Sequence, residues 1–525
     1  PSYKIDEADL LVSFGAEFLE TWLSPVEYAR LFKAMHAVGE DGRKGLFFCI
    51  APYQSLTAAN ADRWLSCHPG SEAVLALGLI REVLRLGRGR GLARSFLQEL
   101  EALSAPYSME RVTEKTGVSG PGYQALIQAL THASRPLVLG SGIGASGPDA
   151  FRTDVAVNCL NWVLDPRLAR IDFEHRHRVE IAATRDRVLQ LFDSLTDRPA
   201  DVLLLQNVNP VYAMPNATSV GSALESRSTF VVSLSSFMDE TSALADLVLP
   251  IRLAAECWGE YGGKSGLLST LQPAMGRLTE APHAGDVLVA AAQGKDLAEG
   301  AAKAYLVSRL LSGGMVRDDM QWVQTLQRGG LFEGAGTVTT SAKPATPQPD
   351  PARLTALKTV PEVDRTGFTL MAAPSIRFFD GRGANRPWLC EVPDPLTRVA
   401  WEAPILVNPD TLKAGGLIQG DRVRVSVGKE QIEAPVYEAP GVKPGVLVVQ
   451  IGQGHTAYGR YAKNQGVNAF RALPVEVDPV SGSPVHLASG ARMTARGTLK
   501  ALAKTDGARI PYDRRIALSV SVKNL

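Results

Sequence analysis

The feature that most constrains the fold is a series of short, continuous apolar stretches that runs up to about residue 345. These stretches are residues 9–15, 45–52, 135–144, 200–210, 228–237 and 245–251. Each is rich in Val, Leu or Phe, which is typical of strands buried on both faces of a parallel sheet. Between them, residues 71–86, 122–133 and 149–164 carry apolar residues at three- and four-residue spacing, which predicts helices. The alternation predicts an α/β fold built from βαβ units.

The pattern changes after a proline-rich stretch at residues 339–354, which lacks periodicity and is predicted to be an exposed linker. Residues 421–427 alternate strictly between polar and apolar side chains, a Gly-Lys pair supplies a turn, and extended sequence continues to residue 451. Strict alternation is typical of antiparallel strands with one buried face. Several such strands at short spacing predict a C-terminal β-barrel.

The length of 525 residues exceeds one ordinary core and indicates about three domains. A polar segment with many turn residues at 105–120 suggests the first boundary. We therefore predict an α/β domain over 1–115, a second α/β domain over 116–338, a linker over 339–360 and a β-barrel domain over 361–525. Because the sequence begins without Met and reaches a strand almost at once, we expect its natural beginning, with any signal peptide, to be missing.

Charge and hydropathy argue against several classes of protein. The 55 basic and 54 acidic residues leave a net charge of +1, so no global field attracts nucleic acid or anionic lipid. No apolar run approaches the roughly 18 residues of a membrane span, so membrane contact is expected only through partners. The five cysteines form no CxxC pair, so no locally spaced iron–sulfur or zinc site is expected in this segment.

One glycine motif raises the question of dinucleotide binding. Gly142, Gly144 and Gly147 have GxGxxG spacing between a predicted strand and a predicted helix, where a pyrophosphate would lie. The full fingerprint needs an acidic residue at the end of a second strand, whereas Asp165 lies in a turn-like sequence. A tight strand-to-helix turn is therefore favoured over binding of NAD.

Polar side chains follow two of the predicted strands. Asn207 and Asn209 follow the strand at 200–210, and Asp239, Glu240 and Thr241 follow the strand at 228–237. Open α/β sheets bind ligands at this end of their strands. A carboxylate and two amides could hydrogen-bond a purine or pterin-like ring, which presents donors and acceptors together. Capping of the next helix explains Asp239 and Thr241 equally well.

A glycine-rich loop, IGQGHTAYGRYAKNQGVNAF, occupies residues 451–470 at the end of a predicted barrel strand. Its glycines cost backbone entropy, which indicates either a ligand close to the backbone or a turn that needs glycine. The sequence contains no Ser/His/Asp set, HExxH motif or P-loop with its lysine, so no catalytic residue is predicted.

Taken in order, these stretches resemble the molybdopterin oxidoreductase superfamily of the dimethyl sulfoxide reductase type. The segments that carry the resemblance are DEADLLVSFGAEFLETWLSP, HPGSEA, LLLQNVNPVYAMP, FVVSLSSFMDETSALADLVLP, AAECWGEYGG, RPWLCEVPDPLT, GDRVRVS and the loop at 451–470. The resemblance covers nearly the whole chain. It implies two intertwined α/β domains and a six-stranded type of barrel that closes over bis-molybdopterin guanine dinucleotide. It also implies cofactor-facing roles for Gly15, Asn209, Glu240, Thr241, Glu256, His455 and Asn468.

The chain departs from the family pattern in two motifs. Ala51-Pro52-Tyr53 stands where the family has Asp-Pro-Arg, and Ser71 and Glu72 stand where threonine and aspartate are usual. The family's metal-ligating residue and iron–sulfur segment lie upstream of the first residue, so an iron–sulfur cluster is conceivable only in a missing N-terminus. These departures favour a chain that has no cofactor in this segment.

ECWGEYGGKSGLLSTLQPAMG and RPWLCEVPDPLT resemble most closely the molybdopterin-like subunits of menaquinone reductase complexes and of alternative complex III. That resemblance implies a metal-free subunit on the periplasmic face of the membrane. Its expected partners are an iron–sulfur subunit, a multihaem cytochrome c subunit and an integral membrane quinone-binding subunit. Without a cofactor, tyrosines or basic side chains of the loop at 451–470 are expected to occupy part of the channel that holds the pterin in active relatives.

Two other functions stay open on the sequence. The first is an active oxidoreductase that holds molybdenum or tungsten on bis-molybdopterin guanine dinucleotide and acts on a small inorganic or sulfur substrate. The second is a free-standing dinucleotide-dependent dehydrogenase, which rests only on the GxGxxG spacing.

Overall fold

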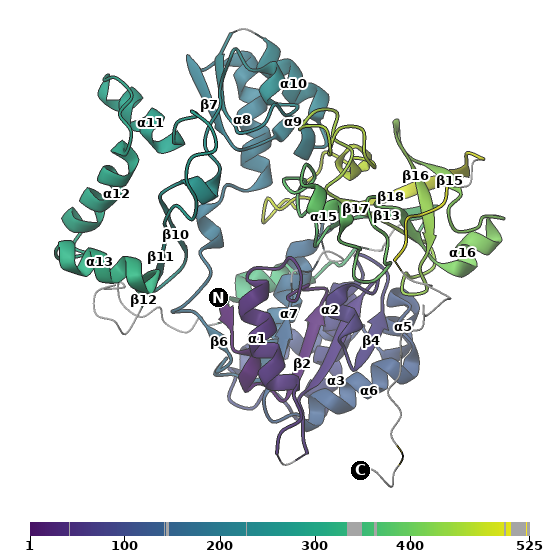
Figure 1. Ribbon diagram of the computed structural model, residues 1–525. Coiled ribbons are helices and arrows are strands. Elements are labelled where there is room, and N and C mark those ends of the chain that lie inside the picture. Colours follow the sequence, from purple (N-terminus) through teal and green to yellow (C-terminus); the bar gives the residue numbers. More distant parts are fainter. Residues whose placement is uncertain are drawn as a thin grey trace.

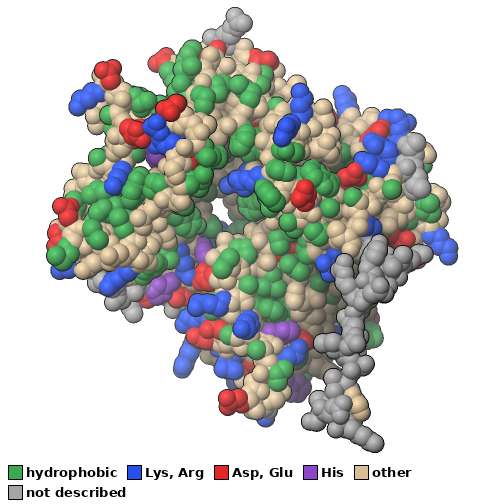
Figure 2. All heavy atoms as spheres, in the orientation of Figure 1, with side chains coloured by type: hydrophobic (Ala, Val, Ile, Leu, Met, Phe, Trp, Pro, Cys, Tyr) green, Lys and Arg blue, Asp and Glu red, His purple; other side chains and the backbone are tan. Residues whose placement is uncertain are grey.

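The computed structural model describes residues 1–40, 42–140, 142, 146–226, 228–332, 349–361, 365–497, 500–505 and 521. Figure 1 shows a first α/β unit at the bottom, a second α/β unit at the top, an extension of helices and short strands on the left, and a β-barrel on the right. The surface is hollowed near the middle of this face, between these parts (Figure 2). The mixture of parallel sheets and a closed barrel confirms the predicted fold class.

The first α/β unit is built on a parallel sheet with the strand order β4-β3-β2-β5. Its strands are β2 (Leu10–Phe14), β3 (Leu46–Ala51), β4 (Arg63–Ser66) and β5 (Pro136–Leu139), and a short antiparallel pair joins β1 (Ser2–Tyr3) to β6 (Ile171–Asp172). Its helices are α1 (Pro25–His36), α2 (Leu56–Ala59), α3 (Glu72–Arg85), α4 (Arg94–Ser104), α5 (Met109–Thr116), α6 (Gly120–His132) and α7 (Ala150–Leu164). The predicted strands and helices of this region are confirmed, although β5 is much shorter than the stretch at 135–144 and α6 begins two residues before the predicted helix.

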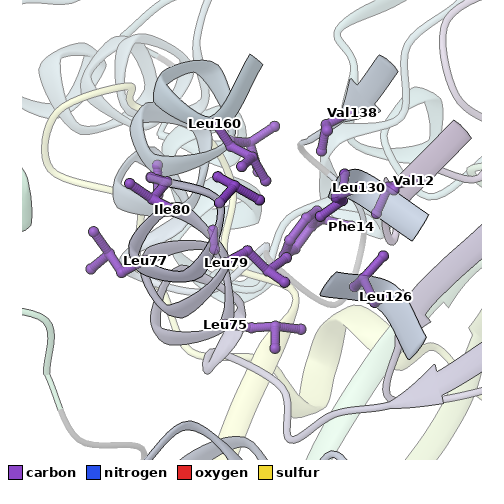
Figure 3. Close-up of a cluster of buried hydrophobic side chains, with 14 of the residues drawn as sticks. Val12, Phe14, Leu75, Leu77, Leu79, Ile80, Leu126, Leu130, Val138 and Leu160 are labelled. Carbon is purple, nitrogen blue, oxygen red and sulfur yellow. The ribbon is translucent and has the colours of Figure 1, made fainter. Parts of the chain in front are cut away.

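Every residue of β2 is buried, as expected of a central strand covered on both faces. Figure 3 shows Val12 and Phe14 of β2 beside Leu79 of α3, Leu130 of α6 and Leu160 of α7. Helix α3 is buried along nearly its whole length because other helices pack around it as well as the sheet. This core holds the first α/β unit together.

The first sheet extends across the domain boundary that we placed near residue 115. Residues 10–13 of β2 pair with residues 136–139 of β5, so both sides of that boundary belong to one sheet. The polar residues that suggested a linker are helix caps instead: the Ser108 side chain caps α5, and the Ser119 side chain caps α6. The first α/β unit therefore continues to β6.

The second α/β unit is a three-stranded parallel sheet with the order β7-β8-β9. Its strands are β7 (Val202–Gln206), β8 (Phe230–Leu234) and β9 (Leu247–Leu249), and its helices are α8 (Arg185–Asp197), α9 (Pro210–Ala213) and α10 (Ala217–Glu225). Phe192 of α8 and Leu224 of α10 pack against Leu205 and Val231 on one face of this sheet. The three strands confirm the predictions for this region.

The extension was not predicted, since we assigned no element to residues 252–338. It consists of an antiparallel sheet of β10 (Gly259–Lys264), β11 (Leu267–Leu271) and β12 (Gly330–Phe332), with α11 (Ala284–Gln293), α12 (Ala301–Ser312) and α13 (Asp319–Arg328). Its small core joins Leu310, Trp322 and Leu331. Residues 339–348 of the predicted linker lie outside the described residues.

The C-terminal region forms the closed barrel β13-β17-β14-β16-β15-β18. Its strands are β13 (Phe368–Pro374), β14 (Ile405–Val407), β15 (Arg422–Val427), β16 (Glu430–Glu438), β17 (Val446–Ile451) and β18 (Leu487–Ala495), accompanied by α14 (Pro351–Leu354), α15 (Pro387–Glu391) and α16 (Pro409–Ala414). The alternation at 421–427 is explained by the buried Val423 and Val425. Two strand pairs, β13–β17 and β14–β16, are parallel, whereas we expected antiparallel pairing. No helix in the described part of the chain is long and apolar enough to cross a membrane.

The barrel docks on the carboxyl end of the first sheet through main-chain contacts. The Gln54 amide donates to the Gly441 carbonyl at 2.6 Å, and the Lys443 amide donates to the Pro52 carbonyl at 2.9 Å. The buried Lys443 ammonium donates to the Ser66 carbonyl at 3.3 Å and to the Gly117 carbonyl at 3.0 Å. These contacts fix the barrel relative to the first α/β unit.

Candidate functional site

The candidate site lies where the second α/β unit meets the loop that follows β17. Strands β7 and β8 end at Gln206 and Leu234, and the loop from Gly452 to Asn468 reaches them from the barrel. A cavity of about 380 Å³ opens between these segments. Its walls include Asn207, Asn209, Tyr212, Asp239, Asp380, Gly381, Arg382, His455 and Tyr458. The site therefore occupies the strand ends at which α/β sheets bind ligands.

The backbone turns sharply directly after β7. Asn207 has φ of 49°, in the left-handed region that asparagine tolerates better than most residues, and its amide donates to the Leu234 carbonyl at 3.0 Å. This turn directs the chain toward Asn209 and α9. The polar residues predicted at this strand end are thus held by local backbone geometry.

Glu240 is the central residue of the site and is nearly buried. Its Oε1 accepts hydrogen bonds from the amides of Thr456 at 2.6 Å and Ala457 at 3.1 Å. Its Oε2 accepts from Asn209 Nδ2 at 2.7 Å and lies 3.2 Å from His455 Nδ1. Burial alone would raise the pKa of Glu240, but the hydrogen bonds from His455 and Asn209 hold that pKa well below its ordinary value. The carboxylate therefore stays charged and joins the α/β unit to the barrel loop.

The His455 ring is packed between two tyrosines. It stacks on Tyr212 with ring centroids 3.7 Å apart and an interplanar angle of 8°. It also stacks on Tyr458, with ring centroids 4.9 Å apart. Its Nε2 is 3.3 Å from the Gly381 carbonyl oxygen. Each ring nitrogen thus lies near an oxygen atom, Nδ1 near Glu240 Oε2 and Nε2 near the Gly381 carbonyl. The ring and the Glu240 carboxylate form a buried contact between the barrel loop and the second α/β unit.

Asn209 and Thr241 form a second set of contacts beside this pair. The Thr241 hydroxyl donates to Asn209 Oδ1 at 2.8 Å and accepts from the Val211 amide at 3.1 Å. Asp239 accepts from the Ser242 amide at 2.7 Å, so the alternative of local capping holds for this carboxylate. Glu240 and Thr241, in contrast, contact residues far away in the sequence.

Asn468 fixes the loop against α9. Its Nδ2 donates to the Tyr212 carbonyl at 2.9 Å, and its Oδ1 accepts from the Phe470 amide at 2.9 Å. The Tyr212 hydroxyl donates to the Gln453 carbonyl at 2.9 Å. The polar atoms of Asn468 are therefore used within the chain.

Two predicted residues lie apart from this group. Glu256 accepts from the amides of Leu253 at 2.9 Å and Leu278 at 2.7 Å, so these hydrogen bonds stay within the extension. Gly15 follows β2 in the first sheet with φ of 74°. A Cβ on Gly142 would lie 1.8 Å from the Gly15 carbonyl carbon, so these two backbones approach as only glycine allows. Gly144 lies outside the described residues.

Asp165 does not lie where the dinucleotide fingerprint needs an acidic residue. It follows the last turn of α7, accepts from the Arg167 amide at 3.1 Å and pairs with the Arg170 guanidinium at 2.6 Å. These contacts close a turn rather than end a strand. The favoured explanation of the GxGxxG spacing, a tight turn, agrees with this placement.

The departure at Ala51-Pro52-Tyr53 places a tyrosine, paired with Glu17, where the family has an arginine. The Tyr53 hydroxyl donates to the Glu17 carboxyl group, and both side chains are buried. Burial raises the pKa of Glu17 well above its ordinary value, as does the nearby Glu20 carboxyl. Among the described residues, no Lys or Arg side chain hydrogen-bonds to this pair, so it offers no cation for a phosphate group.

The polar atoms of the central group do not fit a pterin guanine dinucleotide as they stand. The amides and hydroxyl of Asn209, Thr241 and Asn468 and both oxygens of Glu240 are bonded within the chain. A pterin or purine edge could bond to Glu240 only after the contact with His455 breaks. Within the described residues, no group of three or more His, Cys, Asp or Glu side chains could hold a metal ion.

Sequence reasoning missed Tyr212 and the segment 380–382. Tyr212 lies in the stretch that we singled out after β7, but its partner His455 is 243 positions later, and no local spacing links them. The segment 380–382 lies in a connection between barrel strands and carries no motif. Tyr458 of the glycine-rich loop lines the cavity.

The fold and the barrel define the class of this chain. Residues 394–487 match the family described as the molydopterin dinucleotide binding domain. The whole fold is similar to acetylene hydratase from Pelobacter acetylenicus, with a TM-score of 0.67 and 14% identity over 94% of this chain and 78% of that chain. These similarities confirm the resemblance of the chain to the molybdopterin oxidoreductase superfamily.

Within that superfamily, the similarity extends along nearly the whole chain in one relative. The chain is 27% identical to the menaquinone reductase molybdopterin-binding-like subunit of Nitratidesulfovibrio vulgaris, over 93% of this chain and 71% of that protein. A stretch of 86 residues is 43% identical to the arsenate respiratory reductase molybdopterin-containing subunit of Shewanella sp. strain ANA-3. That stretch covers 16% of this chain and 10% of the reductase subunit.

Proposed function

We propose that the chain is a metal-free, molybdopterin-like subunit of a membrane-associated menaquinone reductase. In this proposal it lies on the periplasmic face of the membrane and braces an iron–sulfur subunit, a multihaem cytochrome c subunit and an integral membrane quinone-binding subunit. Electrons pass between those neighbours and the quinone pool. The support for the complex is the similarity over 93% of the chain to a menaquinone reductase subunit.

One observation carries the metal-free part of the proposal. The family resemblance assigns the Glu240 carboxylate and the His455 ring to cofactor contact, but here they contact each other at 3.2 Å and join the barrel loop to the second α/β unit. Tyr212 covers the face of the His455 ring at 3.7 Å. Side chains that the resemblance assigns to a ligand therefore bond to each other between two domains, as expected of a structural subunit.

The alternative is an active bis-molybdopterin guanine dinucleotide oxidoreductase for a small inorganic or sulfur substrate. The observation in its favour is that residues 394–487 match a dinucleotide-binding domain, while a cavity of about 380 Å³ lies beside His455. This volume lies near the lower end of the roughly 300–1,000 Å³ of small-molecule sites. In that case the Glu240–His455 pair would have to open for the cofactor.

Purification of a tagged full-length protein from detergent-solubilised membranes of its native host tests the proposal. We expect the chain to elute with an integral membrane protein, an iron–sulfur protein and a c-type cytochrome, and the fraction to reduce a menaquinone analogue. A chain that elutes alone and reduces arsenate, thiosulfate or nitrate with an artificial electron donor would contradict the proposal and support the alternative.

A further inference from the structure

One face of the β7–β9 sheet is apolar and largely exposed. Strand pairing brings Val202 beside Phe230, and Leu204 beside Val232 and Leu247, so these side chains share a face. Val202, Leu204, Phe230 and Leu247 are 53%, 52%, 48% and 40% exposed. Strands of a parallel sheet are ordinarily covered on both faces. An exposed face of this kind indicates a missing layer.

The helices in the described part of the chain leave this face open. Helices α8 and α10 cover the opposite face through Phe192 and Leu224. The connection from β8 to β9 contains only the one-turn helix Ser242–Leu244, so no crossover helix is available. Helix α11 reaches only the carboxyl end of the open face, where Ala284 packs near Leu234. Figure 1 shows α11 on one side of β7, and α8 and α10 on the other.

The dimensions of the face select its occupant. Three strands at about 4.8 Å spacing make a face about 10 Å wide, which matches the roughly 10–12 Å diameter of one helix. Four half-exposed apolar side chains present on the order of 300 Å² of apolar surface, the size of patches that are often functional. A stable dimer needs roughly 800 Å² on each partner, so this face is too small to pair with a second copy by itself.

Acidic residues at one edge of the face indicate how the docked helix is oriented. Asp201 precedes β7, Asp246 precedes β9, and both are exposed at the amino end of these parallel strands. The geometry points to an amphipathic helix of another subunit that lays its apolar stripe on the β7–β9 face and places basic residues over Asp201 and Asp246. This inference rests on the proposed function, because it requires that the chain be a subunit of a larger complex.

Substitution of Leu204 in the full-length chain, purified from native membranes, tests the docking face. Leu204→Lys places a charge within the apolar patch, and its half-exposed position lets the ammonium reach water in the free chain. Ile418→Lys in the barrel is the matched control, since Ile418 is 62% exposed. We expect Leu204→Lys to reduce the amount of co-purified partner subunits at least tenfold, with Ile418→Lys equal to the unsubstituted chain.

A second variant and a measurement of thermal unfolding distinguish loss of docking from loss of folding. Asp201→Lys should also reduce co-purification, because the exposed side chain would then repel the basic residues of the helix. Both variants should keep the thermal unfolding midpoint of the isolated chain. Folded variants that retain their partners would overturn the docking face while leaving the proposed function intact.

Cross-linking identifies the occupant. A photo-reactive group at position 204 should attach to a helical segment of another subunit with basic residues at one end. Attachment to a second copy of this chain would overturn the inference. An unsubstituted chain that brings down no partner at all would instead overturn the proposed function, and the docking face with it.

Discussion

At the scale of single residues, Glu240 is the carboxylate through which the second α/β unit and the barrel loop are joined. Both of its oxygens accept hydrogen bonds across this contact, from Asn209 on one side and from Thr456 and Ala457 on the other. The His455 ring completes the pair at 3.2 Å. Removal of this buried carboxylate is costly because the buried donors that bond to it then lose their acceptor.

Glu240→Gln should therefore destabilise the chain strongly. An amide keeps the shape of the side chain but replaces one carboxylate oxygen with an NH₂ group. That group would face N–H donors that bond to a carboxylate oxygen in the unsubstituted chain. We expect a loss of about 3 kcal/mol in the free energy of unfolding, measured by urea denaturation at pH 7. Glu430→Gln, at an exposed carboxylate that begins β16, should change the same quantity by less than about 0.5 kcal/mol.

The pH dependence provides a check on the same variant. The pKa of Glu240 is lower in the folded chain than its ordinary value of 4.5, so the charged form stabilises the fold fully above pH 4.5. That stabilisation is lost as the pH falls through the folded-state pKa. The difference between Glu240→Gln and the unsubstituted chain should shrink below pH 4.5, and a difference independent of pH down to acid would contradict this role.

The residue scale also shows what a sequence can predict about the site. The polar residues after β7 and β8 were predictable because parallel strands place their carboxyl ends together. His455 and Asn468 followed from the family resemblance of their loop. The stack of Tyr212 on His455 was not predictable, since it depends on how the barrel loop approaches α9. Glu256 was assigned to the site by resemblance; in the structure it accepts hydrogen bonds from the amides of Leu253 and Leu278.

At the scale of elements, each predicted apolar stretch contains a strand of a parallel sheet. Strand β4 was not predicted, and the stretches at 135–144 and 200–210 extend several residues beyond β5 and β7. The boundary near residue 115 failed as a division because cap residues and linker residues look alike in sequence. The extension was missed for a different reason: its strands and helices are only partly buried, and Tyr261, Tyr305 and Met320 are mostly exposed. Elements with little burial carry little hydrophobic periodicity.

Helix α3 yields a prediction through Glu72, which lies in its first turn and is 1% exposed. Burial raises the pKa of Glu72 to about 8. Among the described residues, Glu72 Oε2 has no hydrogen-bond partner, while Oε1 accepts from the Cys67 thiol at 3.8 Å. The protonated carboxyl stabilises the fold fully below pH 4.5, and this contribution is lost as the pH rises toward 8.

Glu72→Gln should thus become progressively more stable than the unsubstituted chain between pH 5 and pH 8. An amide has the shape of the protonated carboxyl but does not ionise, so the gain at pH 8 should reach up to about 4 kcal/mol. Urea unfolding at pH 5, 6.5 and 8 measures it. Parallel stabilities of the two chains across this range would show that Glu72 is ionised in the folded state.

At the scale of the whole molecule, the chain keeps the superfamily fold. The polar residues at its centre bond to one another and join the domains. The barrel is fixed to the first sheet through Lys443 and to the second α/β unit through the Glu240–His455 pair. Where the family carries an arginine, the buried Tyr53 and Glu17 offer no cation for a phosphate. A molecule with these contacts is suited to hold other subunits in place.

The most direct test of this account is the molybdenum and tungsten content of the tagged chain, purified from native membranes with whatever subunits accompany it. Elemental mass spectrometry should find far less than one atom of either metal per chain, together with iron and covalently bound haem from the partner subunits. About one atom of molybdenum or tungsten per chain would contradict the account and establish the chain as a metal-dependent oxidoreductase.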